Sequence, residues 1–130
     1  MPIRYRVNSD TGLIETECIG DVRYDEVLAH FAELESDPNL PKRPDVLLDM
    51  SRMDSVPESG QLRSVAAQFD RFPSRIEWGA CAIVAETDLL FGMSRMFQVF
   101  AESHFADSSV VRTRSEAVQW LESRRGPDRS

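Results

Sequence analysis

The chain has 130 residues and a formal net charge of −7, with 22 acidic against 15 basic side chains. This length suits one domain, because single domains usually run to about 100–200 residues. A hydrophobic fraction of 42% and a charged fraction of 28% are typical of a folded protein and exclude general disorder. Nucleic-acid-binding domains normally carry a basic stripe, so the acidic balance predicts no nucleic-acid partner.

Features of the whole sequence narrow the cellular setting. The apolar stretches 80–85 and 89–100 are too short or too interrupted to span a bilayer, and the N-terminus lacks the apolar block of a signal peptide. Cys18 and Cys81 have no CxxC spacing and lie in apolar segments, which favours reduced, buried thiols. We therefore expect a cytoplasmic protein without a transmembrane segment.

The first two segments of the chain alternate apolar and polar residues around the turn cluster 9–12 and predict a β-hairpin. If residue 8 faces residue 13, Arg6 lies opposite Glu15 and Arg4 lies opposite Glu17. Each of these opposite-charge pairs stabilises the register by up to about 1 kcal/mol.

Helical and strand-like segments alternate after the hairpin. A first helix is predicted to end near residue 36, with Asp21 or Asp25 as its N-terminal cap, and further helices are predicted over 58–72, 88–104 and 115–124. Apolar runs predict strands over 45–50, 78–85 and 110–113, with a loop over 51–57. The order β-β-α-β-α-β-α-β-α predicts an α/β fold with one mixed sheet, an antiparallel hairpin followed by parallel strands. Residues 1–124 form one domain in this prediction, and 125–130 form a disordered tail.

Most catalytic templates are missing from the sequence. Neither GxGxxG nor GxxxxGK[ST] occurs, and His30 and His104 stand alone, without the spacing of a zinc site. The segment 92–96 lacks the second glycine of a GxSxG nucleophile elbow and lies inside a predicted helix. We therefore expect no enzymatic activity, no metal and no cofactor.

The segment after the strand 45–50 places polar side chains between the carboxyl end of a buried strand and the start of a helix. Ligands bind at this position in open α/β sheets, and the backbone amides of a helix start favour an anion. Asp, Ser and Pro also occur in any strand-to-helix connection, so a purely structural role stays open. The candidate partner or ligand loop consists of Asp49, Ser51, Asp54, Ser55, Glu58, Ser59 and Gly60.

This segment resembles the signature of SpoIIAA-like (STAS) domains, the anti-sigma-factor antagonists. In that family a strand ends in an Asn- or Asp-containing turn, and an Asp-Ser-Ser-Gly motif opens the next helix. Asp49 takes the strand-end position, and Ser59-Gly60 falls at the Ser-Gly of the motif. The resemblance implies that Ser59 is a phosphoacceptor whose modification controls binding to a partner kinase. Pro57-Glu58 replaces the Asp-Ser of the motif, and an acidic residue beside the acceptor would mimic or abolish such a switch.

The later chain resembles a branch of the same family that is labelled STAS/SEC14, so that the resemblance covers about residues 3–122. Its features are the apolar strand 82–85, a Gly-Met-x-Arg-Met-Phe helix at 92–97 and a closing Glu-Ala-x-x-Trp-Leu at 116–121. The resemblance implies a SpoIIAA-like fold, and a fold alone does not supply an activity.

The segment 89–100 predicts a helix with more apolar surface than one sheet face covers. One face is expected to hold Leu89, Met93, Met96, Phe97 and Phe100, whereas Leu90, Phe91 and Val99 are expected off it. Three roles stay open: a helix wedged between the sheet and another helix, a homodimer interface, and the wall of an apolar pocket. Gly92 costs about 1 kcal/mol inside a helix, which a close backbone approach would justify.

The observations together favour a non-catalytic, cytoplasmic protein-interaction or regulatory module of the SpoIIAA-like type that forms a homodimer. An expected acidic cluster around the loop, consisting of Asp45, Asp49, Asp54 and Glu58, predicts a protein partner with a basic surface. The alternative is a carrier domain for a small apolar ligand or a lipid. A hydrolase built on Ser51, Ser55 or Ser59 is the least favoured hypothesis, because no histidine is placed as its base.

Overall fold

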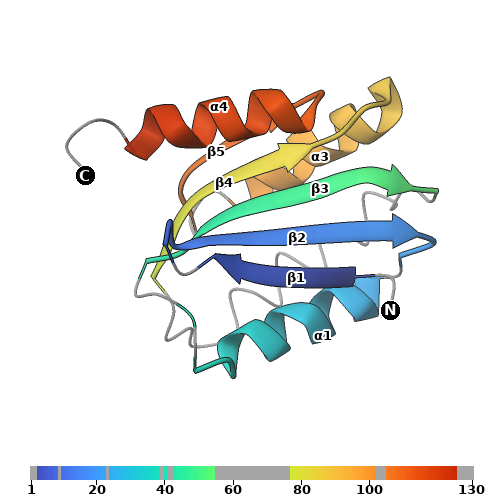
Figure 1. The fold of residues 1–130 in the computed structure, drawn as a ribbon. Helices are drawn as coiled ribbons and strands as arrows, with labels where there is room; N and C mark the ends of the chain where they lie inside the picture. The colour runs from blue at the N-terminus through green and yellow to red at the C-terminus, as the bar shows by residue number, and fades with distance from the viewer. Residues whose placement is uncertain are drawn as a thin grey trace.

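The computed structural model is an α/β fold, in which a five-stranded mixed sheet has helices on both faces (Figure 1). The structure describes residues 3–8, 10–22, 24–38, 40, 43–54, 77–101 and 105–125. The elements follow the order β1 (Ile3–Asn8), β2 (Leu13–Gly20), α1 (Tyr24–Glu35), β3 (Asp45–Met53), β4 (Trp78–Val84), α3 (Asp88–Ala101), β5 (Phe105–Val111) and α4 (Arg114–Arg125). The expected helix over 58–72 lies outside the described residues, as do residues 126–130 of the expected tail.

The β1–β2 hairpin has the register that the charges predict. Arg6 pairs with Glu15 and Arg4 pairs with Glu17 across the antiparallel strands, with guanidinium-to-carboxylate distances of 3.0 and 2.9 Å. The turn between the strands uses Gly12 at a φ of 72°, a conformation that glycine adopts without steric cost. The prediction of a hairpin with this register is confirmed.

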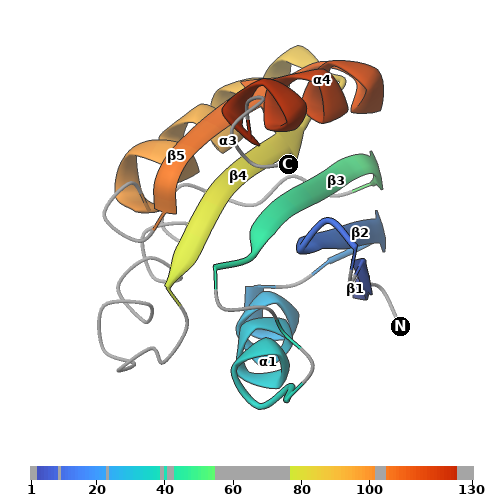
Figure 2. The same ribbon diagram turned by 60° about the vertical axis from the view of Figure 1, so that its left-hand side comes forward.

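The strands β2 to β5 are parallel and lie in sequential order across the sheet. Right-handed crossovers in one direction bring the connecting helices onto the same face of a sheet. Leu34 of α1 and Leu90 of α3 accordingly contribute to one core cluster, whereas Ala117 and Leu121 of α4 pack on the opposite face. Figure 2 shows α1 beside the β1–β3 part of the sheet, and α3 and α4 beside β4 and β5. The predicted α/β class with one mixed sheet is confirmed.

Several boundaries differ from the prediction. β3 continues to Met53, where we expected a loop from residue 51, because a β-bulge lets the strand keep its pairing with β2. β5 begins at Phe105 instead of residue 110. The strand lies at the edge of the sheet, where polar residues are tolerated, so residues 107–109 have a sequence that is typical of a loop.

The ends of two helices also differ from the prediction. α4 begins at Arg114 because the hydroxyl oxygen of Thr113 accepts the backbone N–H of Glu116 at 3.1 Å and also donates to its carboxylate. α4 includes Arg125, where we expected the tail to begin. α1 begins at Tyr24, so that Asp25 lies inside the helix and is not its cap.

His30 is a buried packing residue. Its ring lies edge-on to the ring of Tyr5, with centroids 5.4 Å apart, and its Nε2 atom lies 3.3 Å from the hydroxyl oxygen of Thr16. Burial lowers the pKa of His30 to about 4, because the charged imidazolium would lose its hydration.

We expect His30 to make the protein less stable in mild acid. The unfolded chain binds a proton on this residue near pH 6.5, whereas the folded chain does so only near pH 4. Stability that is present above pH 6.5 is therefore lost as the pH falls toward 4, by up to about 1.4 kcal/mol per pH unit. Urea unfolding at pH 7.5, 6 and 5 checks this, with His30→Gln as the control that should lose less stability. Equal losses in the two proteins would contradict the prediction.

Candidate functional site

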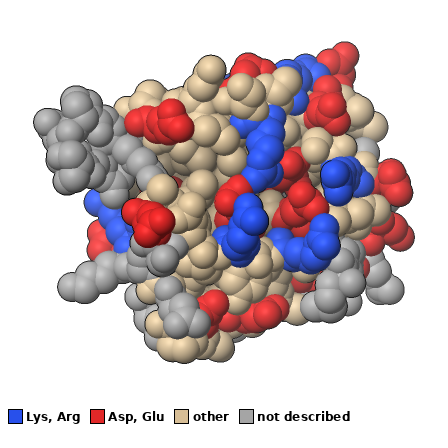
Figure 3. Space-filling view, viewed as in Figure 1, with Lys and Arg blue, Asp and Glu red and all other residues tan. Residues whose placement is uncertain are grey.

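The open side of strands β1, β2 and β3 carries a dense set of charged side chains, which Figure 3 shows as interleaved blue and red atoms in the middle of this view. We call this surface the charged face. Its members are Arg4 and Arg6 of β1, Glu15 and Glu17 of β2, Asp49 and Arg52 of β3, and Arg114 of α4. α4 covers the same side of the sheet over β3, β4 and β5, and therefore leaves β1 and β2 open.

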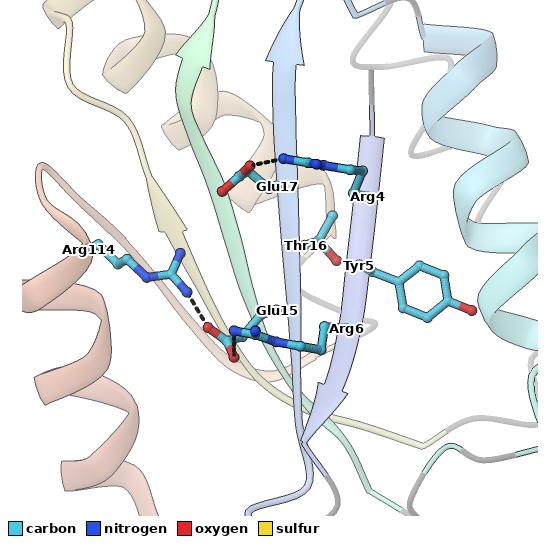
Figure 4. Close-up of a pocket in the computed structure, with 7 residues that line it drawn as sticks. All are labelled: Arg4, Tyr5, Arg6, Glu15, Thr16, Glu17 and Arg114. Carbon is cyan, nitrogen blue, oxygen red and sulfur yellow. Dashed lines mark hydrogen bonds and ion pairs between the residues drawn. The ribbon is translucent and has the colours of Figure 1, made fainter. Parts of the chain in front are cut away.

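The ion pairs of the charged face form two rows across the strands. In the first row Glu15 accepts hydrogen bonds from Arg6, at 3.0 Å, and from Arg114 (Figure 4). In the second row Glu17 lies between two other arginines, Arg4 at 2.9 Å and Arg52 at 3.8 Å. Each glutamate thus lies between two arginines, because β2 lies between β1 and the cations from β3 and α4.

Arg52 belongs to the charged face because of the bulge in β3. Glu17 pairs with Asp49, but Ile19 already pairs with Arg52, so β3 contains one residue more than β2 in this stretch. An inserted residue turns the side chains that follow it to the opposite face of the sheet. Met53 consequently packs against the core. The sequence signal was present as a change of phase in the apolar alternation at residues 50–53, which we interpreted as a loop.

Asp49 is the buried member of the charged face, with a side chain that is only 9% exposed. Its Oδ1 atom accepts the backbone N–H of Ser51 at 3.0 Å and the Ser51 hydroxyl at 2.6 Å, and its Oδ2 atom accepts Arg114 at 3.1 Å. Burial alone would raise the pKa of Asp49, but the hydrogen bonds from Ser51 and the Arg114 guanidinium outweigh it and lower that pKa. Asp49 is therefore a carboxylate held in its charged form.

An open groove of about 320 Å³ runs over this surface and is lined by the charged side chains of Arg4, Arg6, Glu15, Glu17 and Arg114 (Figure 4). Successive side chains of β1 and β2 point to opposite faces of the sheet, so the side chains between these charged residues point away from them. Tyr5 donates its hydroxyl to Asp37 on the other side of the sheet, and Thr16 is buried beside His30. The groove can therefore recognise charge, whereas apolar ligands need a mostly apolar lining.

The structure brings together only part of the loop that the sequence suggested. Asp49 and Ser51 are hydrogen-bonded to each other within β3, and Asp54 is exposed directly after this strand. The other candidates, Ser55, Glu58, Ser59 and Gly60, lie outside the described residues. The resemblance-based role of Ser59 as a phosphoacceptor therefore stays a prediction.

The acidic cluster that we expected around the loop is not formed by the described residues. Asp45 lies at the start of β3, away from Asp54 at its other end, and its buried carboxylate accepts the backbone N–H of Ala80 at 2.9 Å. Asp49 is buried and paired with Arg114. Asp45 and Asp49 thus have structural partners, and the charge beside Asp49 is that of Arg114.

The structure decides which side of α3 faces the sheet, which the sequence left open. Leu90, expected off the main apolar face, is buried, whereas Leu89 and Met96 are exposed. Ser94, a polar residue, also lies on the buried side, so the apolar pattern of the sequence does not mark the side that faces the sheet. Phe91 and Met93 are half-buried, and nothing is described for the side chains of Phe97 and Phe100.

The described part of the chain holds no group of three or more His, Cys, Asp or Glu side chains placed to bind a metal ion. It also contains no helix that is long and apolar enough to cross a membrane. No family model and no curated protein sequence matches the chain, so a function has to be argued from the charged face itself.

Proposed function

We propose that this domain is a non-catalytic protein-interaction module of the SpoIIAA-like type, and that its charged face binds an acidic segment of a partner protein. One observation carries this proposal: the exposed charge of the face is positive. Its four arginine side chains are 43 to 76% exposed, whereas its three carboxylate side chains are 9 to 31% exposed. A partner that approaches this surface meets guanidinium groups first.

The glutamates position the arginines for such a partner. Glu15 holds Arg6 and Glu17 holds Arg4 across the hairpin. These arginine side chains are therefore partly ordered before a partner binds, which reduces the entropy lost on binding. A guanidinium group has five N–H donors, and a pair with one carboxylate leaves donors for a second. The carboxylates of an acidic peptide can therefore accept hydrogen bonds from the same arginines and extend the two rows of ion pairs.

The same arrangement disfavours other ligands. The charged lining of the groove does not suit an apolar ligand or a lipid tail. Guanidinium groups stay protonated in proteins and therefore do not serve as general bases. A cytoplasmic location is part of the proposal, since Cys18 and Cys81 are free, buried thiols.

Charge reversal on β1 tests the proposed function. The double variant Arg4→Glu with Arg6→Glu should bind an Asp/Glu-rich model peptide at least about tenfold more weakly than the parent protein, because it replaces attraction by repulsion. Arg124→Glu is the matched control, since Arg124 lies at the far end of α4 and pairs with Asp107. NMR titration measures both the affinity and the location of the binding site.

The expected titration shifts map to β1, β2, β3 and the start of α4. A peptide of the same sequence with Asn and Gln should not bind. Equal binding of that neutral peptide would contradict the proposal, as would an equal loss in Arg124→Glu. If a single-stranded DNA of the same charge bound more tightly than the acidic peptide, the partner would be a nucleic acid and not a protein.

A further inference from the structure

The strand β1 forms one edge of the sheet, next to the N-terminus in Figure 2. It pairs with β2 on one side, and none of the strands that the structure describes pairs with its other side. Every second residue of an edge strand directs its backbone N–H and C=O groups outward. The free edge of β1 therefore offers hydrogen-bonding groups to a further strand.

Charge alternates from strand to strand along both rows of the charged face. In each row an arginine of β1 is followed by a glutamate of β2 and then by an arginine from β3 or α4. Both rows end at the free edge of β1, with the side chains of Arg4 and Arg6 that are 63 and 76% exposed. Opposite charges on neighbouring strands stabilise their pairing. A strand added at this edge continues the alternation if its side chains on this face are acidic.

The opposite face of the sheet at this edge has a different character. Tyr5 points to that face, where its hydroxyl donates to Asp37 at 2.8 Å. Burial, this hydrogen bond and the charges of Asp37 and Glu33 raise the pKa of Tyr5 to about 12, so acidic groups already surround its ring. Tyr5 and Val7 are half-buried and pack against the core. A side chain added beside them should therefore be apolar and not acidic.

We propose that the acidic segment of the partner protein binds as an added β-strand at the free edge of β1. Two glutamates separated by one apolar residue then lie opposite Arg4 and Arg6, and the apolar residue lies opposite Tyr5. Figure 4 shows both arginines extending from β1 towards β2, so a glutamate reaches them more easily than the shorter aspartate does. The inference rests on the proposed function, to which it adds the backbone conformation and the sequence motif of the partner segment. In such complexes the main-chain hydrogen bonds provide affinity and the alternate side chains provide specificity.

Charge disfavours a second copy of this chain as the added strand. A β1 strand of another molecule would bring its own Arg4 and Arg6 beside these arginines, and like charges on neighbouring strands destabilise their pairing. The other edge of the sheet, β5, has an acidic residue on the side of the sheet that α4 covers, since Asp107 pairs with Arg124 of α4 at 2.7 Å. An acidic strand is therefore expected at β1 and not at β5.

Model peptides with the same composition and a different order test the motif. One has the alternating core Val-Glu-Val-Glu-Val, and its matched control has the core Val-Val-Glu-Glu-Val, in which the two glutamates point to opposite faces of a strand. The alternating peptide should bind at least about tenfold more tightly in an NMR titration, because the control places one glutamate beside Tyr5 and its acidic neighbours. A third peptide, with glutamine in place of glutamate, should not bind.

Methylation of single backbone nitrogens in the alternating peptide tests strand pairing. Alternate N–H groups of an added strand point towards β1, so methyl groups at every second position should abolish binding, whereas those in between should have little effect. Hydrogen exchange of the protein provides the complementary measurement. The bound peptide should slow exchange at alternate amides of β1 and leave the amides of β5 unchanged.

The outcomes separate this inference from the proposed function. An alternating peptide that binds no more tightly than its control would overturn the added strand, as would methylation effects without a two-residue period. Slower exchange at β5 in place of β1 would overturn it too. The proposed function would survive these results if the glutamate peptides still bound to the charged face more tightly than the glutamine peptide. Equal binding of the glutamine peptide would contradict the proposed function itself.

Discussion

Replacing Gly79 by alanine should destabilise the protein by about 3 kcal/mol. Gly79 lies at the start of β4, where its backbone N–H donates to the carbonyl oxygen of Pro44 at 2.8 Å. A Cβ atom at this position would overlap the Oδ1 atom of Asp45 and lie 3.1 Å from that same Pro44 oxygen. Asp45 cannot move aside at low cost, because its carboxylate accepts the backbone N–H of Ala80. The overlap therefore has to be relieved by moving the start of β3 or β4.

Gly92→Ala is the matched control for this steric explanation. The same methyl group at Gly92 meets nothing within 4 Å, and alanine favours the helix by up to about 1 kcal/mol. Urea unfolding should therefore show a lower free energy of unfolding for Gly79→Ala and a higher one for Gly92→Ala. Similar losses of stability in the two variants would show that the contact with Asp45 is not the cause.

Replacing Asp49 by asparagine should destabilise the folded protein by about 2 kcal/mol at pH 7. The substitution keeps the shape of the side chain but removes its charge. Its amide nitrogen would oppose the N–H donors of Arg114 or Ser51, which now share the two carboxylate oxygens. Arg114 would then lose one of its two carboxylate partners and keep only Glu15.

The effect should depend on pH in a defined direction. The folded protein holds the pKa of Asp49 below the ordinary value of 3.8, so the charged carboxylate stabilises the fold above that value. The stabilisation is lost as the pH falls below about 3.8 and through the lower pKa of the folded state. The stability difference between the parent and Asp49→Asn should thus be constant above about pH 5 and shrink below pH 4.

Asp54→Asn makes the same chemical change five residues further along the chain. Asp54 is exposed directly after β3, so this variant should stay within about 0.5 kcal/mol of the parent. Urea unfolding between pH 7.5 and 3.5 compares the three proteins. A loss in Asp54→Asn as large as that in Asp49→Asn would contradict the special role of the Asp49 environment.

The sequence by itself determined the order of the described elements and the register of the hairpin. Alternation with period two and apolar spacing with the helical period are local properties, and they are readable without a tertiary structure. The opposite charges on β1 and β2 have a single register in which all of them pair, and the structure has that register. The two Arg–Glu pairs of the charged face that lie within the hairpin were predictable for this reason.

The remaining members of the charged face depended on the tertiary structure. Arg114 reaches Asp49 across 65 positions of sequence, because α4 crosses to the side of the sheet that α1 and α3 leave free. Arg52 joins the face through a bulge, which shifts the phase of a strand by one residue and which composition does not reveal. The orientation of α3 likewise followed from its neighbours, because an amphipathic pattern cannot tell a face that packs on the sheet from one that packs on another molecule. Local pattern therefore determined the elements, and only the packing of distant segments determined which charges meet and which apolar face stays exposed.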